Sequence, residues 1–142
     1  MQRSAVGMDH EAMNIAERRR QVTGLIRAAR VCTLTTIALD GRLTGRPMLL
    51  QQADFDGELW FFAHADSSLV RQLRVNPEVA VGFGMPQERC WVSLSGTARD
   101  EYQRDRADWL WQPGLSAWFP NGPETTGLTL IAVHVTATHL WE

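Results

Sequence analysis

Two Asp-Gly pairs divide the first half of the chain into short apolar runs. Asp40-Gly41 and Asp56-Gly57 lie between runs at 31–37, 43–52 and 58–63, which are rich in apolar, β-branched and aromatic residues. An Asp-Gly pair between two such runs is typical of a tight hairpin turn, because both of its residues tolerate a positive φ. The sequence therefore predicts three antiparallel strands in a meander.

Three later runs also predict strands and complete the outline of the fold. They span 79–85, 90–99 and 128–141, and the last alternates in the way of a half-buried strand. The segment 112–127 is rich in Pro, Gly and Trp, so we expect a loop with a helical turn there. Six strands with helices around them indicate a closed, mainly antiparallel barrel.

Three helices are predicted at the periphery of this barrel. The first is expected to begin at Asp9. Its apolar stripe consists of Ile15, Val22, Leu25, Ile26 and Ala29. Asp66 is expected to cap a second, short helix that ends at Asn76-Pro77. The segment 100–111, acidic and basic by turns, predicts a third helix on the surface.

The length of 142 residues and the hydrophobic fraction of 44% indicate one globular domain, at 9–142, after a flexible leader at 1–8. The formal net charge of −2 gives no field that attracts nucleic acid. The basic cluster at 18–20 is expected to be a solvated helix face beside Glu17. Because no run has membrane-spanning length or the character of a signal peptide, we expect a cytoplasmic protein without nucleic-acid or membrane partners.

The residue types exclude or disfavour several kinds of chemistry. All fourteen basic residues are arginine, so a Schiff-base lysine is excluded. Cys32 and Cys90 stand singly in apolar runs and are expected to act as small buried hydrophobes, with no disulfide indicated. His134 and His139 are five residues apart on one predicted strand. They are therefore expected to face opposite sides of the sheet, and we expect no metal site.

The stretch 45–68 combines features that suit a phosphorylated ligand. It places Arg46 on one predicted strand, and Ser67 and Ser68 at the helix start that follows the next strand. A helix start has unpaired backbone N–H groups that bind anions, and an arginine one strand away adds positive charge. The pattern is typical of a phosphorylated cofactor that lies against a sheet.

A group of aromatic residues late in the chain is difficult to bury in one small barrel. It consists of Trp109, Trp111, Trp118 and Phe119. A subunit interface or a flat aromatic ligand would explain the group. Plain core packing remains an alternative for Trp109 and Trp111, and it is a weaker explanation for Trp118, which lies close to Pro120.

Four motifs occur in the order that one known family shows. They read GRPM at 45–48, DFDGELWFF at 54–62, VSLSGTA at 92–98 and AWFP at 117–120. With these motifs the chain resembles the general stress protein branch of the pyridoxamine 5'-phosphate oxidase-like, FMN-binding split barrels. The resemblance extends over nearly the whole chain.

The resemblance implies a mainly β fold, a six-stranded antiparallel split β-barrel with peripheral helices. It also implies a homodimer with a flavin at the subunit interface, with FMN preferred and FAD possible. By similarity, Arg46 supplies positive charge to the cofactor and Trp118 helps to close the groove. The residues that the resemblance assigns to the flavin are Arg46, Pro47, Met48, Leu49, Gln51, Phe62, Ala63, Ser67, Ser68 and Trp118.

The chain departs from the family at three positions that are usually polar. The family usually has threonine at the place of Ala63, and lysine at the places of Leu69 and Ser116. Losing a charged hydrogen bond to phosphate costs about 1.5–3 kcal/mol. Two hypotheses therefore remain. In the first, the protein is a flavin-dependent oxidoreductase, although the sequence identifies no general acid or base. In the second, it is a dimeric split barrel that has lost tight flavin binding and serves as a ligand-binding or interaction module.

Overall fold

The computed structural model describes residues 15–51 and 57–142. The predicted leader at 1–8 and the first part of the helix expected from Asp9 lie outside the described residues. Within the described residues, the chain forms one six-stranded sheet with helices around it. No helix in these two ranges is long and apolar enough to cross a membrane.

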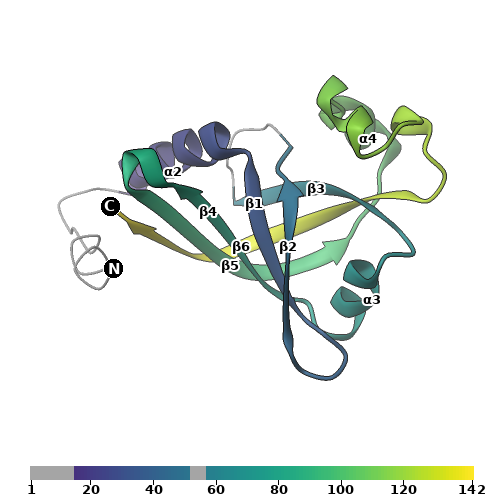
Figure 1. Cartoon of the computed structure of the whole chain (residues 1–142), viewed down its shortest axis with the longest axis horizontal. Coiled ribbons are helices and arrows are strands. Elements are labelled where there is room, and N and C mark those ends of the chain that lie inside the picture. The colour runs from purple at the N-terminus through teal and green to yellow at the C-terminus, as the bar shows by residue number, and fades with distance from the viewer. Residues whose placement is uncertain (1–14, 52–56) are drawn as a thin grey trace.

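All six strands form one antiparallel sheet in the order β2-β1-β4-β5-β6-β3. The strands are β1 (Val31–Ile37), β2 (Leu43–Leu49), β3 (Glu58–His64), β4 (Glu78–Met85), β5 (Cys90–Asp100) and β6 (Leu128–Trp141). The helices are α2 (Ile15–Ala29), α3 (Ser68–Val75) and α4 (Arg104–Leu110), with the short 3-10 helices η1 (Pro86–Glu88), η2 (Pro113–Ala117) and η3 (Gly122–Glu124). Figure 1 shows the sheet strongly curled, with the helices at its periphery, which confirms the predicted fold class.

The main hydrophobic core lies inside the curl of the sheet. Alternate residues of β1, such as Leu34 and Thr36, are buried because successive side chains of a strand point to opposite faces. The helix α2 adds Val22 and Ile26 to this core, and α3 adds Leu73. In Figure 1 these two helices lie at opposite ends of the sheet, so the core is closed by a helix at each end.

The strand β3 is buried on both of its faces. Phe61 enters the main core, whereas Trp60 and Phe62 belong to a second hydrophobic cluster on the other face. Leu110 of α4 and Leu115 of η2 contribute to this second cluster. Because both faces are covered, the aromatic run of β3 is a core strand, as the sequence predicted.

The sheet is curled but not closed by a continuous ladder. The strands β2 and β3 stand at its two edges. They come together just beyond the end of β2, where the backbone N–H of Gln51 donates to the Trp60 carbonyl oxygen at 3.1 Å. The expectation of a closed barrel from strand patterns alone was therefore wrong, and the split form implied by the family resemblance is confirmed.

Several predicted element boundaries needed correction. Ser67, and not Asp66, is the N-cap of α3, and its hydroxyl accepts a hydrogen bond from the Val70 N–H at 3.4 Å. The strand β2 ends at Leu49, short of the predicted position 52. Asp100, predicted to begin a helix, is the last residue of β5, because the backbone ladder with β6 continues to Asp100 opposite Ile131, and its carboxylate accepts a hydrogen bond from buried Thr129.

A register shift between β5 and β6 overturns the expected geometry of the two late histidines. His134 pairs with Thr97 and His139 with Ser93, with the shift between Ser95 and Gly96. Thr97 and Ser93 are an even number of residues apart, so both histidines lie on the same face of the sheet. Nevertheless, no group of three or more metal-ligating side chains occurs in the described part of the chain.

Candidate functional site

Arg46 lies in the middle of β2 and reaches across the end of the barrel to α3. Its Nη1 donates to the Leu34 carbonyl oxygen at 3.3 Å, and its Nη2 donates to Gln72 Oε1 at 3.0 Å. Burial lowers the pKa of the half-buried guanidinium, but an arginine in a protein stays protonated at neutral pH. A fixed positive charge therefore lies between an edge strand and a helix.

Gln72 joins Arg46 to a buried hydroxyl. Thr36 Oγ1 donates to Gln72 Oε1 at 2.5 Å, so the amide oxygen accepts from two side chains. Gln72 is four residues after Ser68 in α3, and residues with this spacing share one helix face. Arg46 consequently meets α3 on the face that carries one of the predicted phosphate-binding serines.

A second arginine folds back over the start of α3. Arg71 Nη1 donates to the Asp66 carbonyl oxygen at 2.6 Å, which brings its guanidinium beside Ser67 and Ser68. Leu69, where the family usually has lysine, points into the main core and is 4% exposed. The cation at this helix start is thus Arg71, on which the sequence pattern alone gave no prediction.

Gln51 is buried in the split between the two edge strands, where it is 2% exposed. Its Nε2 donates to the Leu49 carbonyl oxygen at 3.0 Å. Its Oε1 has no donor among the described residues. A buried acceptor without a partner is costly and is therefore uncommon in native proteins. This oxygen is suited to receive an N–H group of a ligand.

The other predicted residues of β2 alternate between its two faces. Met48 points into the main core, whereas Pro47 is exposed and Leu49 packs against the second cluster. Because β2 pairs only with β1 among the described strands, part of its backbone faces outward and is available to a ligand. Met48 would therefore meet a ligand through its backbone alone.

The predicted residues of β3 are more deeply buried than a ligand-lining role would suggest. The ring of Phe62 lies 5.3 Å from that of Trp111 and 6.4 Å from that of Phe119, between ring centroids. Ala63 belongs to the main core. These two side chains support the strand, so contact with a ligand at this point would fall to the backbone.

Trp118 stands apart from the other predicted residues. It lies at the end of η2 and is 48% exposed, while the next residue, Phe119, is buried in the second cluster. Trp111 also packs against that cluster, which confirms core packing for it, but Trp109 is 70% exposed. Trp118 therefore lies at the surface of the single chain.

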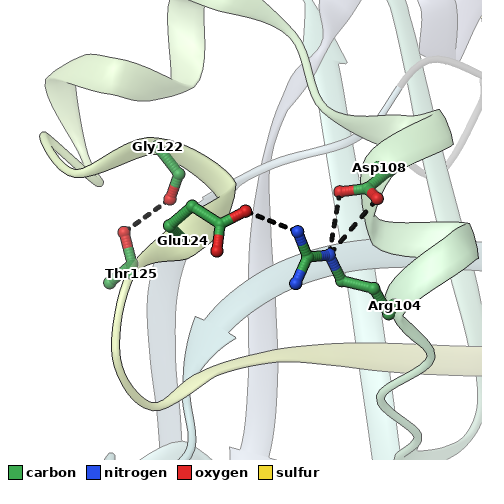
Figure 2. A network of polar contacts seen from close by, with 5 residues as sticks. All are labelled: Arg104, Asp108, Gly122, Glu124 and Thr125. Atoms are coloured by element: carbon green, nitrogen blue, oxygen red, sulfur yellow. Dashed lines mark hydrogen bonds and ion pairs between the residues drawn. The ribbon is translucent and has the colours of Figure 1, made fainter.

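An ionic network holds the segment around Trp118 against α4 (Figure 2). Arg104 Nε lies 3.3 Å from both carboxylate oxygens of Asp108, and its Nη2 lies 2.5 Å from Glu124 Oε1. Thr125 closes the end of η3 with a hydrogen bond to the Gly122 carbonyl oxygen at 2.6 Å. The Arg104–Glu124 pair therefore ties η3, which follows Trp118, to α4, while the Arg104–Asp108 pair lies within α4.

A cleft of about 370 Å³ opens on the α4 side of the molecule. Its described lining consists of Gln103, Asp105, Arg106 and Trp109. The Arg106 guanidinium lies 4.5 Å from the centroid of the Trp60 ring, a cation–π contact. None of the residues that the sequence assigned to the flavin is among these lining residues.

The curled antiparallel sheet, open between β2 and β3, defines a split barrel. The chain belongs to the pyridoxamine 5'-phosphate oxidase-like family, because the sequence model of that family matches residues 17–142. Several of the solved structures with this fold are general stress proteins, the branch of the family that the sequence motifs resemble.

Solved structures from several bacteria are similar to the chain. The general stress FMN/FAD binding protein of Xanthomonas citri is 26% identical, with a TM-score of 0.77 and 89% of each chain covered. The general stress protein 26 of Bacillus anthracis is 21% identical, with a TM-score of 0.78, 87% of this chain and 93% of that chain covered. A Clostridium acetobutylicum protein related to general stress protein 26 is 16% identical, with a TM-score of 0.78 and 87% of each chain covered. No curated protein matches the chain.

Two residues of the site had no signal in the sequence. Gln72 and Thr36 became relevant only through their hydrogen bonds with Arg46 and with each other. The spacing of Gln72 from Ser68 was visible in the sequence, but the packing of α3 against β1 and β2 was not. A partner brought from a different element by tertiary contact is not encoded in local spacing.

Proposed function

We propose that the chain binds FMN at the split of the barrel, with the phosphate near the start of α3. The observation that carries the proposal is that the guanidinium groups of two arginines, Arg46 of β2 and Arg71 of α3, both hydrogen-bond at or beside α3. Arg46 reaches α3 from β2, and Arg71 folds back to its first turn. Two guanidinium groups and a helix start are suited to a phosphate dianion.

The remaining polar group of the split suits the flavin ring. The buried Gln51 Oε1 lacks a donor among the described residues, and a flavin ring carries an N–H group in its pyrimidine edge. Exposed Pro47 and the outward backbone of β2 offer a flat surface beside it. When bound, the flavin supplies redox chemistry, while the chain binds and orients it and sets its electrostatic surroundings.

We also propose that the protein forms a homodimer and that the subunit interface lies next to the flavin. The support is a set of apolar side chains that stay exposed on the single chain, namely Val31, Leu39, Leu43, Val75, Tyr102, Trp109 and Trp118. Val31 and Leu43 lie on the same face of the β1–β2 hairpin as Pro47. Exposed apolar patches of this kind mark interaction surfaces. Size-exclusion chromatography with light scattering is expected to give twice the chain mass, and a monomer would contradict the dimer.

Titration of the purified protein with FMN tests the flavin proposal. Flavin fluorescence is expected to fall on binding, with FMN bound more tightly than riboflavin, which lacks the phosphate. FAD in a parallel titration reports how far the site accepts the larger dinucleotide. A colourless protein that leaves FMN fluorescence unchanged at high micromolar concentration would reject the proposal. Oxidation of NADH or NADPH by the loaded protein then tests the oxidoreductase role.

A second candidate function is a split barrel that binds another ligand and has no tight flavin site. The position of Leu69 favours it, because the lysine usual in the family is replaced by a side chain in the core. The same titration separates the two functions. A dimer that fails to bind FMN would be an interaction or ligand-binding module.

A further inference from the structure

We propose that Gln72 is a positioning residue that holds the Arg46 guanidinium in place while leaving its charge available to the flavin phosphate. The inference rests on the proposed flavin function and deepens it, since nothing in the family resemblance assigned a role to Gln72. The inference is based on the hydrogen bonds among three side chains: Arg46 on β2, Thr36 on β1 and Gln72 on α3. They come from three elements, so the arrangement depends on the fold.

The two donors determine the orientation of the Gln72 amide. Arg46 has only donors, so the atom of Gln72 that faces it must be the carbonyl oxygen. The Thr36 hydroxyl is fully buried and donates to the same oxygen. An amide oxygen has two lone pairs, and both are used. The Gln72 side chain is therefore held from two sides and in turn holds Arg46.

Some N–H donors of the Arg46 guanidinium are not used by the described residues in this arrangement. A guanidinium has five N–H donors. One serves the Leu34 carbonyl oxygen and one serves Gln72 Oε1, and the described residues supply no further acceptor. The remaining donors belong to a group that is half-buried and fixed in direction. A preorganised cation of this kind binds an anion without first losing rotamer freedom.

The Gln72 side chain is neutral, so it can orient Arg46 without cancelling its positive charge. A glutamate would accept the same two hydrogen bonds, but it would form an ion pair with Arg46 and cancel its charge. Charge-assisted hydrogen bonds are stronger than neutral ones, so such a pair would hold the fold at least as well. It would also place a negative charge beside the incoming phosphate. Gln72 thus orients the cation without neutralising it.

Gln72→Glu tests this directly, with FMN and riboflavin as the two probes. We expect the variant to fold with unchanged or higher thermal stability and to bind FMN at least roughly tenfold more weakly, the loss of one charged hydrogen bond. Riboflavin binding should change much less, because riboflavin carries no phosphate. The control is Gln87→Glu, which adds the same charge at an exposed position of η1, and its FMN affinity should stay within twofold of the wild type.

Two outcomes would overturn the inference. One is FMN binding by Gln72→Glu at the wild-type affinity, and the other is an equal loss for FMN and riboflavin, since the charge would then act on the ring. If Gln72→Glu fails to fold, Gln72→Met replaces it. That variant removes the acceptor and adds no charge, so a loss of FMN affinity with riboflavin unaffected supports the inference, and unchanged FMN affinity overturns it.

A further probe separates this inference from the proposed function. If the wild type binds no FMN, inorganic pyrophosphate at millimolar concentration takes its place in a thermal-shift assay. Stabilisation of the wild type that is lost in Gln72→Glu would support the positioning role at an anion site, while the flavin proposal fails. If pyrophosphate does not stabilise the wild type either, both proposals fail.

Discussion

The His134 carbonyl oxygen lies 1.9 Å from the place where a Cβ atom on Gly96 would stand. Only glycine fits there, and Gly96 is the residue at which the ladder between β5 and β6 shifts its register. The long strand β6 pairs with β5 on one side and with β3 on the other. The close approach of two backbones thus explains one glycine of the VSLSGTA motif.

Gly96→Ala is therefore expected to destabilise the protein by about 1–3 kcal/mol or more, the cost of forcing extra atoms into a packed site. Thermal or urea denaturation measures the change. Gly82→Ala is the matched control, because Gly82 lies in β4 with nothing within 4 Å of the added methyl group. Equal stability of the two variants would contradict the steric argument.

The register shift between β5 and β6 is a feature that the sequence did not predict. The strand patterns predicted β1 and β6 with their observed bounds, because both are runs of apolar and β-branched residues. Burial follows a period of two along β1, whereas residues 128–133 of β6 are all buried. The facing of His134 and His139 was wrong, because one extra residue in β6 reverses the faces and leaves the local composition unchanged. Patterns within an element are readable from sequence, whereas the register between two elements is not.

In the candidate site, too, some features were predictable from the sequence and others were not. The motif around Arg46 and the serines at the helix start pointed to an anion site from sequence alone. The roles of Arg71 and Leu69 depended on the rotation of α3, which only the packed structure shows. Family resemblance supplied the split of the barrel, since strand patterns cannot distinguish an open sheet from a closed one.

Arg46→Gln is expected to weaken FMN binding by roughly ten- to a hundredfold, because it removes a charged donor to phosphate. Riboflavin binding should change less. Fluorescence titration gives both affinities, and Arg20→Gln on the exposed face of α2 is the control for loss of one positive charge. Unchanged FMN affinity in Arg46→Gln would remove Arg46 from the site.

Leu69→Lys restores the lysine usual in the family and is expected to cost at least about 2 kcal/mol of folding free energy, because it exchanges a buried apolar side chain for a charged one. Leu69 packs with Val70 and Leu73 in the core. Leu69→Met is the control and should cost less than about 1.5 kcal/mol. A stable Leu69→Lys protein with tighter FMN binding would show that this position reaches the phosphate after all.

Cys32 should make stability fall at alkaline pH. Burial raises the pKa of its thiol from 9.0 to about 12. Between these values the unfolded chain loses the proton and the folded chain keeps it, so folding is weakened as pH rises above 9.0, by at most roughly 1.4 kcal/mol for each pH unit. Urea denaturation of wild type and Cys32→Ala at pH 8 and pH 10.5 measures the difference. The wild type should lose more stability than the variant, and equal losses would contradict the prediction.

Arg104→Ala should loosen η3 from α4, because it removes the ion pair between Arg104 of α4 and Glu124 of η3. Hydrogen exchange is expected to become faster in the segment 118–125 and to stay unchanged in β4. Arg20→Ala, on the exposed side of α2, controls for loss of an arginine. Equal hydrogen-exchange rates in the segment 118–125 of Arg104→Ala and of the wild type would mean that the network does not restrain this segment.

The proline of β2 has a consequence for what the open edge of the sheet can accept. Pro47 stands opposite Thr33 in a strand that has a single neighbour among the described strands. Unpaired edges are where strands of other chains add and where aggregation begins. A proline offers no N–H group and interrupts any ladder built onto it. A small ligand needs only a few hydrogen bonds, so Pro47 leaves room for the proposed cofactor at this edge while it disfavours the addition of a strand from another chain.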